Sequence, residues 1–290
     1  MVTLDAIRGP VAQELEEFDA FVRRNFKVEN ELLSGMVDYI LSSRGKGVRP
    51  LLVLLSAALN APAGGRGIGQ RTYLAAMLVE IIHTASLIHD DVIDEADTRR
   101  GRASANAKWQ SRNAVVLGDY LLARNMELGM RSGQYDLVSY VIASIATLCE
   151  GELLQSDRAE RMEITRDAYL EIIYKKTASL LGISAGVGAL SAGANREQVA
   201  RMRRFGDALG MAFQIQDDIL DLVSTAEVLG KPVLSDEKNE KTTYVTLKGL
   251  EKAKAEVKTL SDRAADALNS LPGDKEFLGT LIKTLVDREK

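Results

Sequence analysis

The chain has 290 residues, of which 46% are hydrophobic and 27% are charged. This balance is typical of a globular protein and excludes a disordered chain. A net charge of −4 excludes a general electrostatic attraction to nucleic acid or anionic lipid. We expect no transmembrane segment, because no apolar run approaches the roughly 18 to 20 residues that cross a bilayer. The acidic N-terminus does not resemble a signal peptide, so the expected location is cytoplasmic.

The distribution of proline predicts an all-α protein. Proline breaks helix interiors, and none of the five prolines lies between Pro62 and Pro232. Apolar residues at helical spacing dominate this interval, and we find no convincing strand because β-branched alternation is scarce. No long sequence repeat and no linker divides the chain. We therefore expect a single domain over residues 1–290.

Amphipathic spacing predicts the helices in chain order. The first two include residues 11–22 and 32–41, and a third begins near Pro50 after the glycine-containing segment SSRGKGVRP. The later helices are expected to include residues 78–94, 109–129, 137–158, 167–190, 196–223 and 257–268, with a short helix at the C-terminus. Thr165 is a candidate cap, and Asn195 with Gln198 resembles a capping box. Residues 224–241 are interpreted as a polar loop.

The chain has one cysteine, Cys149, so an intrachain disulfide is excluded. It lies in the apolar run VIASIATLCE, which we interpret as part of the core. A reactive thiol is not expected there, because a buried cysteine behaves as a small hydrophobic side chain.

Two aspartate motifs with the same spacing stand in apolar helical surroundings. Their members are Asp90, Asp91 and Asp94 in LIHDDVIDEADTRRG, and Asp217, Asp218 and Asp221 in MAFQIQDDILDLV. One such motif alone is more often a solvated helix face, but the repetition makes coincidence a poor explanation. Carboxylates one helical turn apart repel each other, so a cation is expected to hold them. Mg²⁺ suits the motifs because it takes carboxylate oxygens and completes its shell with phosphate.

Other metals fit less well, because the chain has only two histidines. Glu80 and His83 form one Glu-x-x-His motif, but a di-iron bundle needs two copies. Basic residues near glycines and near the acidic motifs suggest capture of two phosphorylated anions, one through metal and one through direct hydrogen bonds. These basic residues are Lys46, Arg49, Arg99, Arg100, Lys176, Lys231 and Lys241.

The motifs GKxxRP, HTASLIHDDVIDxxDxRRG, YKKTA and FQIQDDILD followed by GKP resemble those of the trans (E-type) polyprenyl diphosphate synthases. Their order and spacing hold across nearly the whole chain. The resemblance implies a bundle of mostly antiparallel helices around a deep central cavity, usually in a homodimer. It also implies a Mg²⁺-dependent prenyltransferase, with three ions in the ternary complex, that extends an allylic diphosphate with isopentenyl diphosphate.

The resemblance implies roles for individual residues. The metal ligands are Asp90, Asp94 and Asp217, supported by Asp91, Asp218 and Asp221. The allylic diphosphate is bound by Arg99, Lys176 and Lys231, and isopentenyl diphosphate by Lys46, Arg49, His83 and Arg100. The reacting centre is lined by Thr177 and Gln214, and Lys241 is a further substrate-binding candidate.

Two small residues, Ala85 and Ser86, lie one turn before Asp90 and are expected to form the first floor of the product tunnel. Their size favours a product longer than C15. The alternative is a short-chain farnesyl or geranylgeranyl diphosphate synthase, in which a bulky residue at 115–122 closes the tunnel. A class I terpene cyclase is disfavoured by the intact second motif. A non-catalytic subunit of a heteromeric synthase is disfavoured because both motifs and the basic residues are present.

Overall fold

The computed structural model describes residues 4–43, 45–62, 67–161, 164–229 and 242–286. These residues form helices and one short hairpin. The N-terminal elements are α1 (Leu4–Arg8), the 3-10 turn η1 (Gly9–Val11), α2 (Ala12–Asn25), α3 (Glu31–Ser42) and α4 (Val48–Leu59). The central elements are α5 (Gln70–Ile93), β1 (Thr98–Arg99), β2 (Arg102–Ala103), α6 (Ala105–Arg131) and α7 (Tyr135–Glu160). The remaining elements are α8 (Arg166–Ile173), η2 (Tyr174–Ala178), α9 (Ser179–Ser191), α10 (Arg196–Leu229), α11 (Tyr244–Lys248), α12 (Leu250–Asn269) and α13 (Glu276–Val286).

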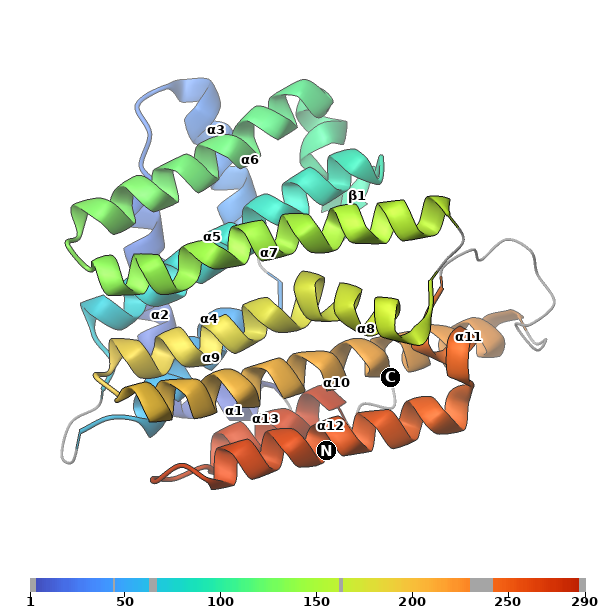
Figure 1. The fold of residues 1–290 in the computed structure, drawn as a ribbon. Helices are drawn as coiled ribbons and strands as arrows, with labels where there is room; N and C mark the ends of the chain where they lie inside the picture. Colours follow the sequence, from blue (N-terminus) through green and yellow to red (C-terminus); the bar gives the residue numbers. More distant parts are fainter. Residues whose placement is uncertain (1–3, 44, 63–66, 162–163, 230–241, 287–290) are drawn as a thin grey trace.

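The long helices alternate in direction, as in an antiparallel bundle. Helices α5, α7 and α10 run one way, and α6, α9 and α12 return in the opposite direction (Figure 1). Helices α5 and α10 therefore end at the same end of the bundle, where the β1–β2 hairpin, α8 and α11 also lie (Figure 1). The prediction of an all-α bundle of mostly antiparallel helices is confirmed. The only strands among the described residues are the two strands of the hairpin, each two residues long.

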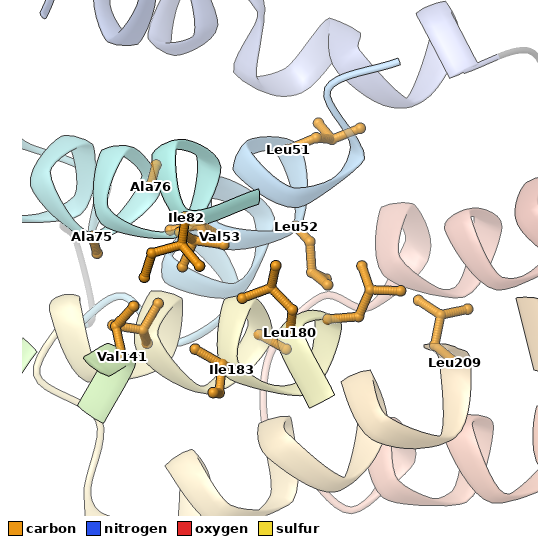
Figure 2. Packing of buried hydrophobic residues seen from close by; sticks show 14 of the residues in the cluster. Leu51, Leu52, Val53, Ala75, Ala76, Ile82, Val141, Leu180, Ile183 and Leu209 are labelled. Carbon is orange, nitrogen blue, oxygen red and sulfur yellow. The ribbon is translucent and has the colours of Figure 1, made fainter. Parts of the chain in front are cut away.

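Helices α4, α5, α7, α9 and α10 share the buried centre of the bundle. Fully buried Leu52, Ile183 and Leu209 come from three of these helices (Figure 2), and each contributes about 1.5 to 3 kcal/mol of burial free energy. Helix α9 is rich in small residues, which brings it close to α4. A Cβ atom at Gly188 would lie 2.3 Å from the carbonyl oxygen of Val53, so only glycine fits this contact. The small residues of α9 therefore serve close helix packing.

Two predicted helix starts are confirmed by their caps. The hydroxyl of Thr165 accepts a hydrogen bond from the backbone N–H of Ala168 at 3.2 Å. The side chains of Asn195 and Gln198 each accept the other residue's backbone N–H at 3.0 Å, which is the predicted capping box. At its other end α10 continues to Leu229, so the prediction that the loop begins at residue 224 was wrong.

The predicted helix over residues 167–190 is interrupted. Helix α8 ends at Ile173, and the π-helical turn η2 precedes α9. A π turn adds one residue to a helical turn and is frequent at functional sites. The added residue changes which side chains of this segment face the pocket described below.

Helix α7 is more exposed than its composition predicts. Cys149 is exposed, so its assignment to the core was wrong. By length and hydropathy both α5 and α7 could cross a membrane, but 67% of the apolar window of α5 is buried inside the bundle and only 28% of that of α7. One set of exposed residues, most of them apolar, follows a spacing of four and three along α7. This surface, called the α7 stripe below, comprises Tyr135, Ser139, Ile142, Ala146, Cys149 and Leu153.

Candidate active site

The first aspartate motif closes α5. Asp90 lies in the last turn, and the backbone N–H of Asp94 donates to the carbonyl of Asp90 at 2.8 Å. The helix C-terminus carries partial negative charge, so a carboxylate here is unfavourable without a cation. Burial, followed by the charge of Glu152 on α7, raises the pKa of Asp90 to about 6. A bound metal ion would offset the negative charge of the Asp90 carboxylate.

Asp91, between these two residues, points into the protein. It is buried, and its carboxylate accepts hydrogen bonds from the guanidinium of Arg99 in β1. The ion pair fixes the hairpin against the end of α5 and directs Arg99 toward the charge of Asp90, which it partly compensates. Asp91 thus positions a basic residue, and its support of a metal ion stays a prediction.

The second motif repeats this arrangement on α10. Asp218 is buried, and its carboxylate accepts hydrogen bonds from the Tyr169 hydroxyl of α8 and from the backbone N–H of Tyr244 at 3.2 Å. The amide of Gln214 donates to its other oxygen at 3.4 Å. Burial, followed by the negative charge of Asp218, raises the pKa of Tyr169 well above its usual range, so the hydroxyl keeps its proton and donates. Asp217 is half-buried on the same helix.

The π turn η2 directs Lys176 and Thr177 toward α7 and α10. The ammonium of Lys176 donates to Gln155 Oε1 at 3.0 Å, and the Thr177 hydroxyl donates to Gln214 Oε1 at 3.0 Å. A pocket of about 470 Å³ lies between these elements. Residues of both aspartate motifs and of the π turn line this pocket. The lining includes Asp94, Gln155, Tyr169, Lys176, Thr177, Gln214 and Asp218. Sequence reasoning missed Gln155, Tyr169 and Glu152, because their contacts cross between helices.

We predict that Tyr169→Phe lowers kcat about 10-fold, because a buried carboxylate loses a donor and the second motif shifts. The ring packing against Tyr244, with centroids 6.0 Å apart, should be kept. The matched control is Tyr73→Phe, which removes a 2.7 Å hydrogen bond to Glu17 in another part of the bundle. Both variants should lose about 1 to 3 kcal/mol of stability in chemical unfolding. Equal kcat values for the two variants would contradict the prediction.

A basic cluster lies beside the first motif, between α4 and α5. Burial lowers the pKa of Arg49 to about 10, and its Nε atom has no hydrogen-bond partner among the described residues. Burial and the charges of Arg49 and Arg100 hold the pKa of His83 well below its usual range, so the imidazole is neutral. A buried guanidinium N–H without an acceptor suits an anion. The positive charge of Arg49 lies close enough to interact with both Glu80 and His83. It would repel a metal cation held by these two side chains, which disfavours an iron site here.

The loop before α4 is held by two arginines. The guanidinium of Arg8 donates to the carbonyl of Lys46 at 2.6 Å, and that of Arg100 donates to the carbonyl of Ser43 at 2.6 Å. Arg100 also covers Gly45, where a Cβ atom would lie 2.6 Å from the guanidinium carbon. The structure therefore places Lys46, Arg49, His83 and Arg100, the predicted binders of isopentenyl diphosphate, in one region. Arg8 has no motif and could not be found from the sequence.

The donor set fits Mg²⁺ rather than a closed protein site. Among residues 4–43, 45–62, 67–161, 164–229 and 242–286, no three His, Cys, Asp or Glu side chains are grouped to hold one ion. Mg²⁺ commonly binds one or two carboxylates and completes its octahedron with water and substrate phosphate. Asp90, Asp94 and Asp217 could supply such ligands from two helices. The predicted binders Lys231 and Lys241 lie outside the described residues.

Comparisons with known proteins agree with this geometry. The family model for polyprenyl synthetase matches residues 30–275. A short chain isoprenyl diphosphate synthase of Methanothermobacter thermautotrophicus is 37% identical over 77% of this chain and 68% of its own length. An all-trans-nonaprenyl-diphosphate synthase (geranyl-diphosphate specific) of Rhodobacter capsulatus is 34% identical over 89% and 78%. The crystal structure of a decaprenyl diphosphate synthase from Rhodobacter capsulatus has a TM-score of 0.85 at 29% identity, covering 99% of this chain and 100% of that one.

The fold and the two aspartate motifs define a trans-prenyltransferase. The chain belongs to the polyprenyl synthetase family. Enzymes of this family use Mg²⁺ and act on isopentenyl diphosphate and an allylic diphosphate.

Proposed function

We propose that this enzyme condenses isopentenyl diphosphate with an allylic diphosphate and repeats the reaction to make an all-trans polyprenyl diphosphate longer than C15. The observation that carries the proposal is the pocket of about 470 Å³ in which Asp94, Lys176, Thr177 and Gln214 meet Asp218. Two carboxylate motifs and a lysine around one pocket suit a diphosphate with its metal ions. The enzyme acts in the cytoplasm.

In this proposal Asp90, Asp94 and Asp217 would hold the Mg²⁺ ions, which when bound would supply positive charge to stabilise the leaving diphosphate. Lys176 and Arg99 bind the same diphosphate and favour ionisation of the allylic C–O bond. Isopentenyl diphosphate lies on the basic cluster, its double bond attacks the allylic cation, and the released diphosphate takes the proton. The apolar helices exclude the water that would quench the cation.

Product length is set on α5 below the metal site. Ser86 is half-buried and lies one turn before Asp90 on the same helix, whereas Ala85 is fully buried. A small side chain on the half-buried position leaves space for a growing prenyl chain. In the alternative floor, residues 115–122 of α6, Val115 and Val116 are exposed, at 39% and 61%, whereas Leu117 and Leu121 are buried and are the bulky residues that could close the tunnel.

We further propose that the enzyme is a homodimer that covers the α7 stripe. Isolated apolar side chains are common on surfaces, but a continuous stripe along a helix is typical of an interface. Its spacing of four and three suits packing against a second helix. A second copy of this chain supplies an identical stripe, as a two-fold interface requires.

Ile142→Asp should therefore convert the dimer to monomer, because burying an unpaired carboxylate at the stripe is unfavourable. Leu32→Asp is the matched control, since Leu32 is 64% exposed on α3 and lies outside the stripe. Sedimentation velocity should show the dimer for the wild type and the control, and a monomer for Ile142→Asp. A monomeric wild type at micromolar concentration would refute the dimer.

The function is tested by incubating the enzyme with Mg²⁺, labelled isopentenyl diphosphate and, separately, C5, C10, C15 and C20 allylic diphosphates. Product lengths are then resolved by chromatography. The proposal predicts incorporation that stops beyond C15. Arrest at C15 with every shorter primer would replace it with the short-chain alternative. Binding without any incorporation would favour a non-catalytic subunit.

A further inference from the structure

Glu152 of α7 is a carboxylate close to the first motif that belongs to neither aspartate motif. Its Oε2 atom lies 2.5 Å from the ammonium of Lys176, and both side chains are 28% exposed. The close contact depends on Gly151. A Cβ atom there would lie 2.8 Å from Lys175 Cβ and 3.0 Å from Lys176 Cγ, so glycine alone allows α7 to touch the π turn at this point.

A neighbouring pair between the same two elements provides a contrast. Lys175 pairs with Glu150 at 3.3 Å and with Glu171 at 3.0 Å, and these carboxylates are 63% and 53% exposed, against 28% for Glu152. The inner pair, Glu152 with Lys176, lies close enough to Asp90 to act on its charge. The two pairs have the same chemistry, but only the inner one faces the metal motif.

We propose that Glu152 is a positioning residue that couples diphosphate binding to metal binding through Lys176. This inference rests on the proposed function. Without metal, the lysine charge is neutralised by Glu152, and the surrounding carboxylates of Asp90 and Asp94 repel a diphosphate. Once Mg²⁺ offsets the carboxylates, the ammonium can turn from Glu152 to the diphosphate, and Gln155 remains as its second acceptor at 3.0 Å. The enzyme therefore retains little allylic diphosphate in the absence of metal.

The proposed coupling predicts the direction in which the affinity for the diphosphate changes when Glu152 loses its charge. Removing the negative charge of Glu152 frees Lys176 and weakens the repulsion of the diphosphate, so metal-free binding should strengthen by about 10-fold. The same removal weakens the attraction for Mg²⁺. The ratio of the Kd without metal to the Kd with Mg²⁺ should therefore fall by about 10-fold or more. A purely structural role for Glu152 would leave this ratio unchanged, because it would alter both Kd values equally.

The experiment measures the Kd of an allylic thiolodiphosphate, whose C–S bond resists ionisation, by calorimetry with EDTA and with Mg²⁺. It compares the wild type with Glu152→Gln and with the outer-pair control Glu150→Gln. The same substitution of Glu152 is repeated in a Lys176→Met background, which forms a double-mutant cycle. The expected result is a lowered ratio for Glu152→Gln, no change for Glu150→Gln, and a clearly smaller effect of Glu152→Gln when Lys176 is absent.

An unchanged ratio for Glu152→Gln, or an equal change for Glu150→Gln, would overturn the coupling role. An effect of equal size without Lys176 would overturn it too, because Glu152 would then act on the metal and the diphosphate without the lysine. Failure of the proposed function has a different signature. In that case the wild type itself would show no Mg²⁺-dependent binding of the thiolodiphosphate.

Discussion

Asp90→Asn should lower kcat by about 10³-fold or more while the bundle stays folded. An amide is a poor Mg²⁺ ligand, so the proposed site would lose affinity for the ion that stabilises the departing diphosphate. The substitution keeps the size of the side chain. Steady-state incorporation of isopentenyl diphosphate at saturating Mg²⁺ measures the loss, and circular dichroism checks the fold. A variant with near-normal kcat would remove Asp90 from the metal site.

The same substitution should stabilise the metal-free protein at neutral pH. The pKa of Asp90 is raised from 3.8 to about 6 in the folded chain, first by burial and then by Glu152. Between about pH 4 and 6 the folded state retains a proton that the unfolded state has released, so stability falls as the pH rises through this window. Above it the charged carboxylate is fully unfavourable. After discounting for solvent screening, Asp90→Asn should gain about 1 kcal/mol at pH 7.

Chemical unfolding in EDTA at pH 4 and at pH 7 tests this expectation. The advantage of Asp90→Asn should be present at pH 7 and should disappear near pH 4. Loss of stability at pH 7, or an advantage independent of pH, would mean that the carboxylate has a partner that already compensates it.

Ser86→Phe should shorten the product to C20 or less. The side chain lies on the half-buried face one turn before Asp90, where an aromatic ring would occupy the path of the growing chain. The equivalent change at Ala85 is a poorer test. Ala85 is fully buried, and a ring there would cost several kcal/mol of stability through overpacking.

Chromatography of the products with a C10 or C15 primer measures the effect. Ser86→Ala is the control and should keep the wild-type length, because the side chain stays small. If Ser86→Phe leaves the length unchanged, the floor lies elsewhere, and the buried Leu121 of α6 becomes the next position to substitute.

The sequence predicts the fold well because its signals are local. Helical periodicity, the absence of proline between Pro62 and Pro232, and the caps at Thr165 and Asn195 each depend on neighbouring residues. The repeated aspartate spacing identified the two helices that meet at the pocket. The assignment of Cys149 to the core was wrong because the sequence pattern of an apolar helix face is the same whether that face is buried or exposed.

Several features of the site could not be predicted from the sequence because they depend on contacts between helices. The partners of the buried Asp91 and Asp218, which are Arg99 and Tyr169, follow only from the packing of different elements against one another. Glu152 lies 24 residues before Lys176, and no spacing rule connects residues in different helices. The π turn is equally hidden, because YKKTA continues a helical pattern on both sides. The structure also reveals a repeated feature: the second aspartate of each DDxxD motif is the buried one.

A crystal structure with Mn²⁺ and an allylic thiolodiphosphate would show directly whether the two aspartate motifs hold the metal ions. Anomalous scattering locates the ions without reference to the fold. We expect ions that bridge the diphosphate to Asp90 and Asp94 on one side and to Asp217 on the other, with Lys176 on the same diphosphate. A diphosphate bound away from both motifs, or ions bound without contact to it, would show that the motifs do not form the active site.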